Sequence, residues 1–309
     1  MRASTFRAFF RAFFRASRGR FSLSESPTDP TEPTGLRGRL AAYRRAFTAY
    51  RRLLGAAIRG QLAYPASFAL QCLGQALAQA GDLVAVLVLF NHVRAMGGFT
   101  VDEVLVLYGI ASVAFGLADG AVGELSTLPV YIRTGRLDAL LLRPMSALGQ
   151  LCASGIALRR LGRILTGLIV LGYALTKVNI EWTAPRIALA VVAPVAGAIV
   201  LGAVWVAACS VCFWLVEGRE LANSVTDGSN MFTAYPLGVF NSWLRRLMGF
   251  LVPGAFVAYF PTLALLGKPD PLGLPEFLQW SSLAVAMLAV LVASRVWRLA
   301  LRHYQGTGS

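Results

Sequence analysis

Ile187–Val216 reads IALAVVAPVAGAIVLGAVWVAACSVCFWLV, thirty consecutive residues that carry no charged side chain. A helix of about 20 apolar residues is enough to cross the hydrocarbon core of a bilayer, which is about 30 Å thick. As a straight helix this stretch would be about 45 Å long, so we expect it to tilt, to protrude from the membrane or to bend at Pro194. The stretch therefore predicts a membrane-spanning helix.

Five further apolar stretches lie on either side of it. The chain of 309 residues is 56% hydrophobic and only 14% charged, a balance that excludes a soluble fold. The stretches are approximately Tyr64–Phe90, Val104–Val130, Ile164–Leu175 (short unless it extends back to Ile156), Leu247–Leu266 and Leu278–Trp297. We predict an all-α, polytopic membrane protein with six transmembrane helices.

The arginines and lysines between these stretches set the predicted orientation, because cytoplasmic loops carry an excess of both. One set follows the second and fourth spans or lies near the termini: Arg133, Arg136, Arg143, Arg159, Arg160, Arg163, Arg219, Arg245, Arg246, Arg295, Arg298 and Arg302. The other loops hold only Arg94, Lys177, Arg186 and Lys268. Six spans with both termini in the cytoplasm fit this distribution.

The first sixty residues are basic and hold no span. They contain 13 arginines and three acidic residues, which is +10 of the net charge of +14. We divide the chain into a basic amphipathic extension with a flexible linker (1–35), an amphipathic helix on the inner membrane surface (36–62) and a six-span domain (63–309). The extension could equally be dispensable. A basic flank beside spans indicates anionic lipids, so we expect the lipid membrane as a partner and no nucleic acid.

Between the second and third spans, residues 132–144 read IRTGRLDALLLRP. Gly135 can adopt a positive φ that ends one helix, and Pro144 would end a second, short helix that begins at Leu137. Such a helix, parallel to the membrane, could pass a rigid-body movement into the adjoining spans. The residues alone equally allow an ordinary basic loop on the inner side.

Acidic residues inside spans are costly, which makes each a candidate functional residue. Asp82 lies in the first span, and Asp119 and Glu124 lie in the second, among glycines that allow close helix packing. Asn230 belongs to a polar stretch, residues 224–241, that could form a second inner interfacial helix or continue the fourth span. These four residues could line a translocation path. Alternatively, Glu124 reaches the inner interface, and the two aspartates pair with side chains or backbone groups.

The sequence lacks short motifs for nucleotide binding or hydrolysis. It has no GxxxxGK[ST] phosphate loop, no HExxH motif and no GxSxG motif. Cys209 and Cys212 lie on an apolar helix without a nearby histidine, so neither a metal site nor a structural disulfide is indicated. We therefore expect a chain that is not an enzyme and binds no cofactor itself. If it does energised work, another chain must bind the ATP.

Four stretches, in order along residues 40–309, carry a family resemblance. They are GGFTVDEV (97–104) with Tyr108-Gly109, the segment 132–144, YPL (235–237) followed by LVPGAF (251–256) and YFP (259–261), and the ending LRHYQGTGS (301–309). On these residues the chain resembles the membrane subunit of type-2 ABC (ATP-binding cassette) exporters, in the branch with six spans and a separate ATPase subunit. Residues 1–35 have no counterpart in that pattern.

The resemblance implies that the segment after the second span is a coupling helix that docks on the ATPase subunit. The residues it would use there are Arg133, Gly135, Arg136, Leu137, Asp138, Leu141, Arg143 and Pro144. The helix before the first span would also lie against the ATPase. The complex would contain two ATPase copies, which bind ATP and Mg, and a second permease, homologous or identical. Its expected place is the bacterial plasma membrane, and its cargo stays open.

Two other function classes fit parts of the sequence. A secondary transporter driven by protons through Asp82 and Asp119 would work without ATP, but the inverted repeats typical of that class are not visible. A membrane-embedded enzyme acting on lipids would need acidic or histidine side chains clustered at one membrane depth. The sequence shows no such cluster.

Overall fold

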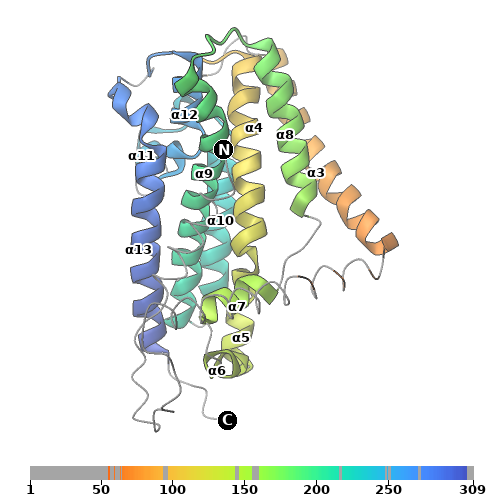
Figure 1. Cartoon of the computed structure of the whole chain (residues 1–309), viewed down its shortest axis with the longest axis vertical. Helices are drawn as coiled ribbons and strands as arrows, with labels where there is room; N and C mark the ends of the chain where they lie inside the picture. The colour runs from red at the N-terminus through yellow and green to blue at the C-terminus, as the bar shows by residue number, and fades with distance from the viewer. Residues whose placement is uncertain are drawn as a thin grey trace, which may run out of the picture.

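A computed structural model of the chain describes residues 65–92, 97–142, 146–154, 160–215, 218–247, 252–270 and 273–304, with the single positions 55, 59, 63 and 249. The regular structure of these residues is helical, and they contain no β-strand. Figure 1 shows an elongated bundle of long helices with short helices at both ends. The predicted all-α class is confirmed. The extension 1–35, nearly all of the interface helix 36–62, and Arg143 and Pro144 lie outside the described residues.

Within the described residues, six helices of 16 residues or more form the bundle. They are α3 (Pro65–His92), α4 (Val101–Val122), α8 (Arg160–Lys177), α9 (Ala184–Ser210), α10 (Gly218–Thr233) and α13 (Ser282–His303). Shorter helices connect them: η1 (Gly123–Thr127), α5 (Leu128–Arg133), α6 (Arg136–Leu141), α7 (Ala147–Ser154), η2 (Val211–Phe213), η3 (Leu237–Val239), α11 (Ser242–Arg246), η5 (Gly254–Phe256), α12 (Tyr259–Leu266) and η6 (Glu276–Trp280).

Among the described residues, four stretches of helix are long and apolar enough to cross a membrane. They are Pro65–Val88, Val101–Arg133, Ala184–Phe213 and Ser282–His303. They match the first, second, fourth and sixth predicted spans. The third predicted span falls on α8, which contains three cationic residues, and the fifth includes Gly254–Leu266, a shorter apolar helix. The chain is thus a membrane protein with several apolar helices.

The long helices pack as a row of neighbours. α3 contacts α8, α8 contacts α4, α4 contacts α9, and α9 contacts α13, while α10 packs against α9 and reaches α4 (Figure 1). α5, α6 and α7 lie at the lower end of the bundle in Figure 1, and α12 lies near the upper end. We call these the α6 end and the α12 end.

Glycines bring α4 and α8 into close contact. A Cβ added to Gly109 would lie 2.8 Å from Leu171 Cα, and one added to Gly167 would lie 2.9 Å from the Val113 nitrogen. Small residues let helix backbones approach closely, and in a membrane that close packing, rather than water exclusion, holds helices together. α8 is therefore fixed against α4 over several turns.

The structure differs from both expectations for residues 224–241. They neither lie along the inner surface nor continue α9, because α10 turns back and packs along α9. Its hydroxyl groups explain how a polar helix can do so. Ser229 Oγ donates to the Val225 carbonyl at 2.6 Å and Thr233 Oγ1 to the Ser229 carbonyl at 2.9 Å, so both buried hydroxyls are satisfied within α10 itself.

The segment that follows α10 lies at the α12 end. A Cβ on Gly238 would lie 3.0 Å from Gly97 Cα, just before α4 begins. Leu247–Leu266 does not form one continuous helix, because Val252 and Pro253 before η5, and Val257 and Ala258 between η5 and α12, are not helical. α11, which carries Arg245 and Arg246, is at this same end (Figure 1), so these two arginines do not share the α6 end with Arg133 and Arg136 as the charge distribution predicted.

Polar contacts fasten the α12 end over the start of α4. The Lys268 ammonium lies 2.7 Å from the Glu103 carboxylate, and the same carboxylate accepts the Thr100 backbone N–H at 2.9 Å, closing the first turn of α4. Behind them the Tyr259 hydroxyl donates to the buried Asp270 carboxylate at 2.6 Å. These bonds hold the loop after α12 in one place.

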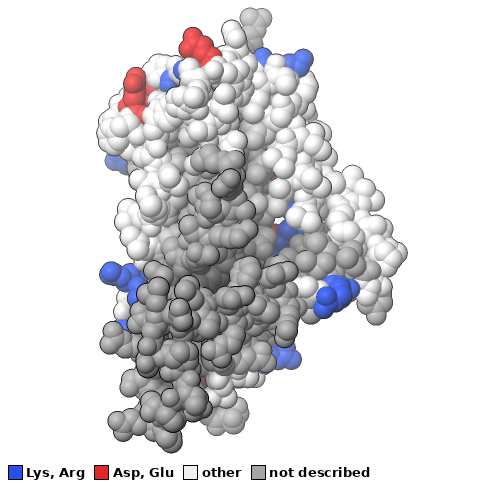
Figure 2. Space-filling model, in the orientation of Figure 1, with Lys and Arg blue, Asp and Glu red and all other residues white. Residues whose placement is uncertain are grey.

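The outside of the bundle is mostly apolar. Figure 2 shows a largely uncharged surface, with charged groups at the upper end and basic groups again in the lower half. α3 contributes most of its length to this surface, including Leu70, Leu73 and Leu77. Such a surface fits contact with lipid or with another membrane subunit.

Candidate functional site

The predicted coupling segment forms two short helices that meet at Gly135. Its φ of 67° lies in the left-handed region, as expected for a glycine that ends α5 and starts α6. Leu137 is fully buried and Leu140 packs on the core, whereas Arg133 and Arg136 are exposed. α6 is therefore anchored by one face, while Arg136 at its start and Arg133 at the end of α5 are exposed beside it.

A buried side chain ties α6 to α7. Gln150 Nε2 donates to the Leu140 carbonyl at 2.9 Å, and Gln150 itself is buried. The last carbonyls of a helix have no partner within the helix, so this bond satisfies one of them. This bond and the packing of α6 on α7 hold the two short helices together.

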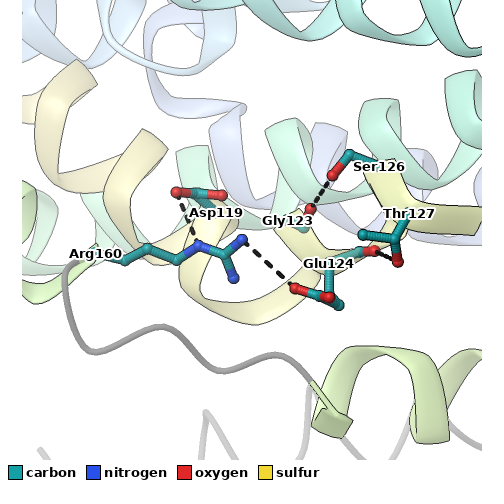
Figure 3. A network of polar contacts seen from close by, with 6 residues as sticks. All are labelled: Asp119, Gly123, Glu124, Ser126, Thr127 and Arg160. Atoms are coloured by element: carbon teal, nitrogen blue, oxygen red, sulfur yellow. Dashed lines mark hydrogen bonds and ion pairs between the residues drawn. The ribbon is translucent and has the colours of Figure 1, made fainter. Parts of the chain in front are cut away.

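A three-residue ionic cluster lies where α4 ends and η1 begins (Figure 3). Arg160, the first residue of α8, has its Nε 3.1 Å from Asp119 Oδ2 and its Nη2 4.0 Å from Glu124 Oε2. The Arg160 side chain is 10% exposed. Two predicted path residues are thereby brought together around a cation from the same chain. Their role in translocation stays a prediction.

The backbone around the cluster is bent and leaves room for it. The Ser126 and Thr127 hydroxyls donate to the Gly123 and Glu124 carbonyls at 3.0 and 2.7 Å (Figure 3). A Cβ at Gly123 would collide with Asp119 Oδ1 and would lie 2.9 Å from Arg160 Nη2. A side chain at this position would therefore force the Asp119 carboxylate and the Arg160 guanidinium to shift.

A second arginine of α8 reaches the predicted path residue Asn230. Arg163 Nη2 donates to Asn230 Oδ1 at 2.5 Å, and its guanidinium carbon lies 3.8 Å from the centre of the Phe115 ring. The three residues come from α8, α10 and α4. A guanidinium over an aromatic face combines a cation–π attraction with a hydrogen bond, which makes its partial burial tolerable.

Asp82, the fourth predicted path residue, lies on the exposed face of α3. One turn earlier, buried Gln79 accepts a hydrogen bond from the Tyr108 hydroxyl of α4 at 2.9 Å. α3 is therefore bonded to the bundle next to an exposed carboxylate. Asp82 also interacts electrostatically with Tyr108 of α4 and Arg163 of α8.

The end of α13 reaches the α6 end through aromatic contacts. Phe213 of η2 stands edge-on to Trp297 and to Tyr304, with ring centres 5.5 and 5.9 Å apart. The Tyr304 hydroxyl is buried and close enough to the Asp138 carboxylate of α6 to interact with it. The last residues of α13 therefore border the predicted coupling helix.

Arg160 and Arg163 are the functional candidates that sequence reasoning missed. They were counted as loop arginines because positive charge next to a span normally marks the inner side. Their spacing by three residues, directly before an apolar run, is a signal that α8 begins earlier and carries both on neighbouring turns. Pairing with distant acids and rings could not be read from that spacing.

Comparison with known proteins identifies the family. A family model described as ABC-2 family transporter protein matches residues 76–308, about three quarters of the chain. No curated protein and no solved structure matches it. The match runs from α3 through α6 and α10 to just beyond α13, so it includes all four predicted path residues and the whole predicted coupling segment. The chain belongs to the ABC-2 family of transporter proteins.

Proposed function

We propose that this chain is the permease subunit of an ATP-driven exporter, and that it couples to a separate ATPase subunit through α6. The observation that carries this proposal is the construction of α6 at one end of a membrane bundle: Leu137 anchors it inside, and Arg133 and Arg136 remain exposed. The chain belongs to a family of transporters, and its sequence contains no phosphate loop. An ATP-driven mechanism therefore needs a partner subunit that binds ATP and Mg.

The proposal includes six membrane crossings, made by α3, α4, α8, α9, α10 and α13. α8 and α10 are less apolar than the other four, but both pack inside the row of long helices. An even number of crossings places both ends of the chain on one side, which we take to be the cytoplasmic side of a bacterial plasma membrane, where α6 would meet the ATPase.

The translocation path would lie along α10 and the exposed face of α3, and a second permease, homologous or identical, would close it. Asp227 and Ser224 of α10 and Asp82 of α3 are exposed, although exposed polar groups on membrane helices normally face a cavity or a partner. Two ATPase copies would complete the complex.

The test reverses the charges of α6 in the full chain. The ATPase that copurifies with the tagged chain from its native membranes is reconstituted with the Arg136→Glu/Asp138→Lys double variant, and transport-coupled ATP hydrolysis is measured. We expect a loss of about tenfold or more, the size of a typical coupling between two sites. Glu181→Lys/Arg186→Glu is the matched control, because it reverses an ion pair of 3.3 Å that links the start of α9 to the loop before it.

Full coupling in the α6 double variant would overturn this assignment of α6. Transport by the chain alone, insensitive to ATP and abolished by an uncoupler, would replace the proposed function with that of a secondary transporter.

A further inference from the structure

We propose that Arg160 is the positioning residue of a joint between α8 and the bend after α4, through which a displacement of α6 reaches α8 and α3. This inference rests on the proposed function, since it describes how a push on α6 would travel. We call Asp119, Glu124, Arg160 and Gly123 the joint.

η1 lies among the helices of the α6 end. It contacts α4, α5, α7, α9 and α10, and α7 is bonded to α6 through Gln150. Thr127 and Ser126 close this turn with their own hydroxyls, so η1 holds a defined bend rather than a loose loop. A movement of α5 or α6 therefore reaches η1 directly, as it also reaches η2 through α5 and the end of α13 through Asp138.

The described part of α8 starts at the joint. Arg160 is its first described residue and is the cation between Asp119 and Glu124, which lie on either side of the boundary between α4 and η1. A change in the bend alters the separation of the two carboxylates. Because one guanidinium must serve both, the start of α8 has to follow that change.

α8 connects the joint to α3. Above the joint, Gly109 and Gly167 pack α8 backbone to backbone against α4, so α8 responds as a rigid unit. α3 has its main packing contact with α8. A displacement of the start of α8 therefore tilts the helix that exposes Asp82.

The energetics favour a positioning role over a stabilising one. Desolvating three charges offsets much of their attraction, so a partly buried ion pair adds little net stability, whereas removing one partner leaves the others uncompensated. Asp119 also interacts electrostatically with Arg163, the next arginine of α8. What the joint supplies is a fixed distance between α8 and the start of η1.

The test uses two variants that break the joint in different ways. Arg160→Gln removes the charge, and Gly123→Ala keeps every charge but places a methyl group where Asp119 and Arg160 meet. Gly120→Ala is the matched control, because a Cβ there meets nothing within 4 Å. We expect both joint variants to lower transport-coupled ATP hydrolysis about tenfold while the ATPase still binds. Arg160→Lys should keep most of the coupling, and the exchange Asp119→Arg/Arg160→Asp should recover part of it.

A second measurement needs no ATPase. Spin labels on Leu142→Cys, next to α6, and Leu77→Cys, on α3, report the distance between the two ends of the proposed route in the full chain. We expect a narrow distance distribution for the unaltered joint and for Gly120→Ala, and a clearly broader one for Arg160→Gln and Gly123→Ala.

The outcomes separate the two proposals. Wild-type coupling or an unchanged label distribution in both joint variants would overturn the joint, even if α6 proves to bind the ATPase. If no ATPase binds the wild-type chain, the proposed function fails. The widths of the distance distributions between the spin labels then decide whether Arg160 links α6 to α3.

Discussion

At the scale of single residues, Tyr304 shows how the last helix and the predicted coupling helix influence each other. Burial, and then the neighbouring Asp138 carboxylate, raise the pKa of Tyr304 to about 12. A folded pKa above the value for an unfolded chain, near 10, means that the stability supplied by the neutral hydroxyl is fully present below pH 10 and is lost as the pH rises towards 12.

We predict that Tyr304 ionises at a higher pH than a tyrosine in an unfolded chain. The wild-type chain and Tyr304→Phe are titrated in parallel by the ultraviolet absorbance of tyrosinate, and the difference between the curves should have its midpoint near pH 12. Asp138→Asn should lower that midpoint, since it removes the negative charge beside the hydroxyl. A midpoint near 10 in the wild-type chain would show that Tyr304 does not face α6.

At the scale of helices, the contact between α4 and α8 depends on the absence of side chains. A Cβ on Gly167 would lie 2.9 Å from the Val113 nitrogen, and backbone cannot move aside as a flexible side chain can. We predict that Gly167→Ala destabilises the chain by about 1–3 kcal/mol, as overpacking does. Its thermal unfolding temperature in detergent should fall by about 2–4 °C for each kcal/mol.

Gly172 is the matched control for this prediction, because it lies on the same helix and an added Cβ there would meet nothing within 4 Å. Gly172→Ala should leave the unfolding temperature unchanged or raise it slightly, since alanine favours helix more than glycine does. Equal destabilisation by the two substitutions would mean that α4 and α8 are not packed backbone to backbone.

The positions of some helices along the chain can be predicted from the sequence better than those of others. The four helices long and apolar enough to cross a membrane overlap apolar stretches expected from the sequence, because length and hydropathy decide whether a helix can cross a bilayer. α8 includes Arg160, within the extension back to Ile156 that its short apolar run left open, and α10 follows neither course expected for its polar stretch. Their polar groups are satisfied by partners far away in sequence, as Arg163 is by Asn230, or by their own backbone, as Ser229 is.

The predicted site divides in the same way. Gly135 and the apolar face of α6 follow from local rules for glycine and helix spacing, so the form of α6 could be predicted. The contact that Asp119 and Glu124 share with Arg160 could not be predicted. Hydropathy reports the cost of burying each charge but carries no information about its ionic partner.

At the scale of the whole molecule, the two ends of the bundle make the topology testable. Arg245 and Arg246 were assigned to the side of α6 by counting charges, whereas α11, which holds them, lies at the α12 end. Charge counting fails here because polar α10 returns along α9 and carries the chain away from the α6 end before these arginines occur. Side-specific labelling distinguishes the two arrangements.

We predict opposite labelling of single cysteines at Leu142, beside α6, and at Trp243, in α11, which are 88% and 62% exposed. In a background without the four native cysteines, a membrane-impermeant maleimide applied to right-side-out vesicles should label Trp243→Cys but not Leu142→Cys, and inside-out vesicles should give the reverse. Phe277→Cys in η6, before α13, is the control for the α12 end and should behave like Trp243→Cys. Labelling of Trp243→Cys and Leu142→Cys from one side would restore the arrangement inferred from charge alone and would remove α10 as a membrane crossing.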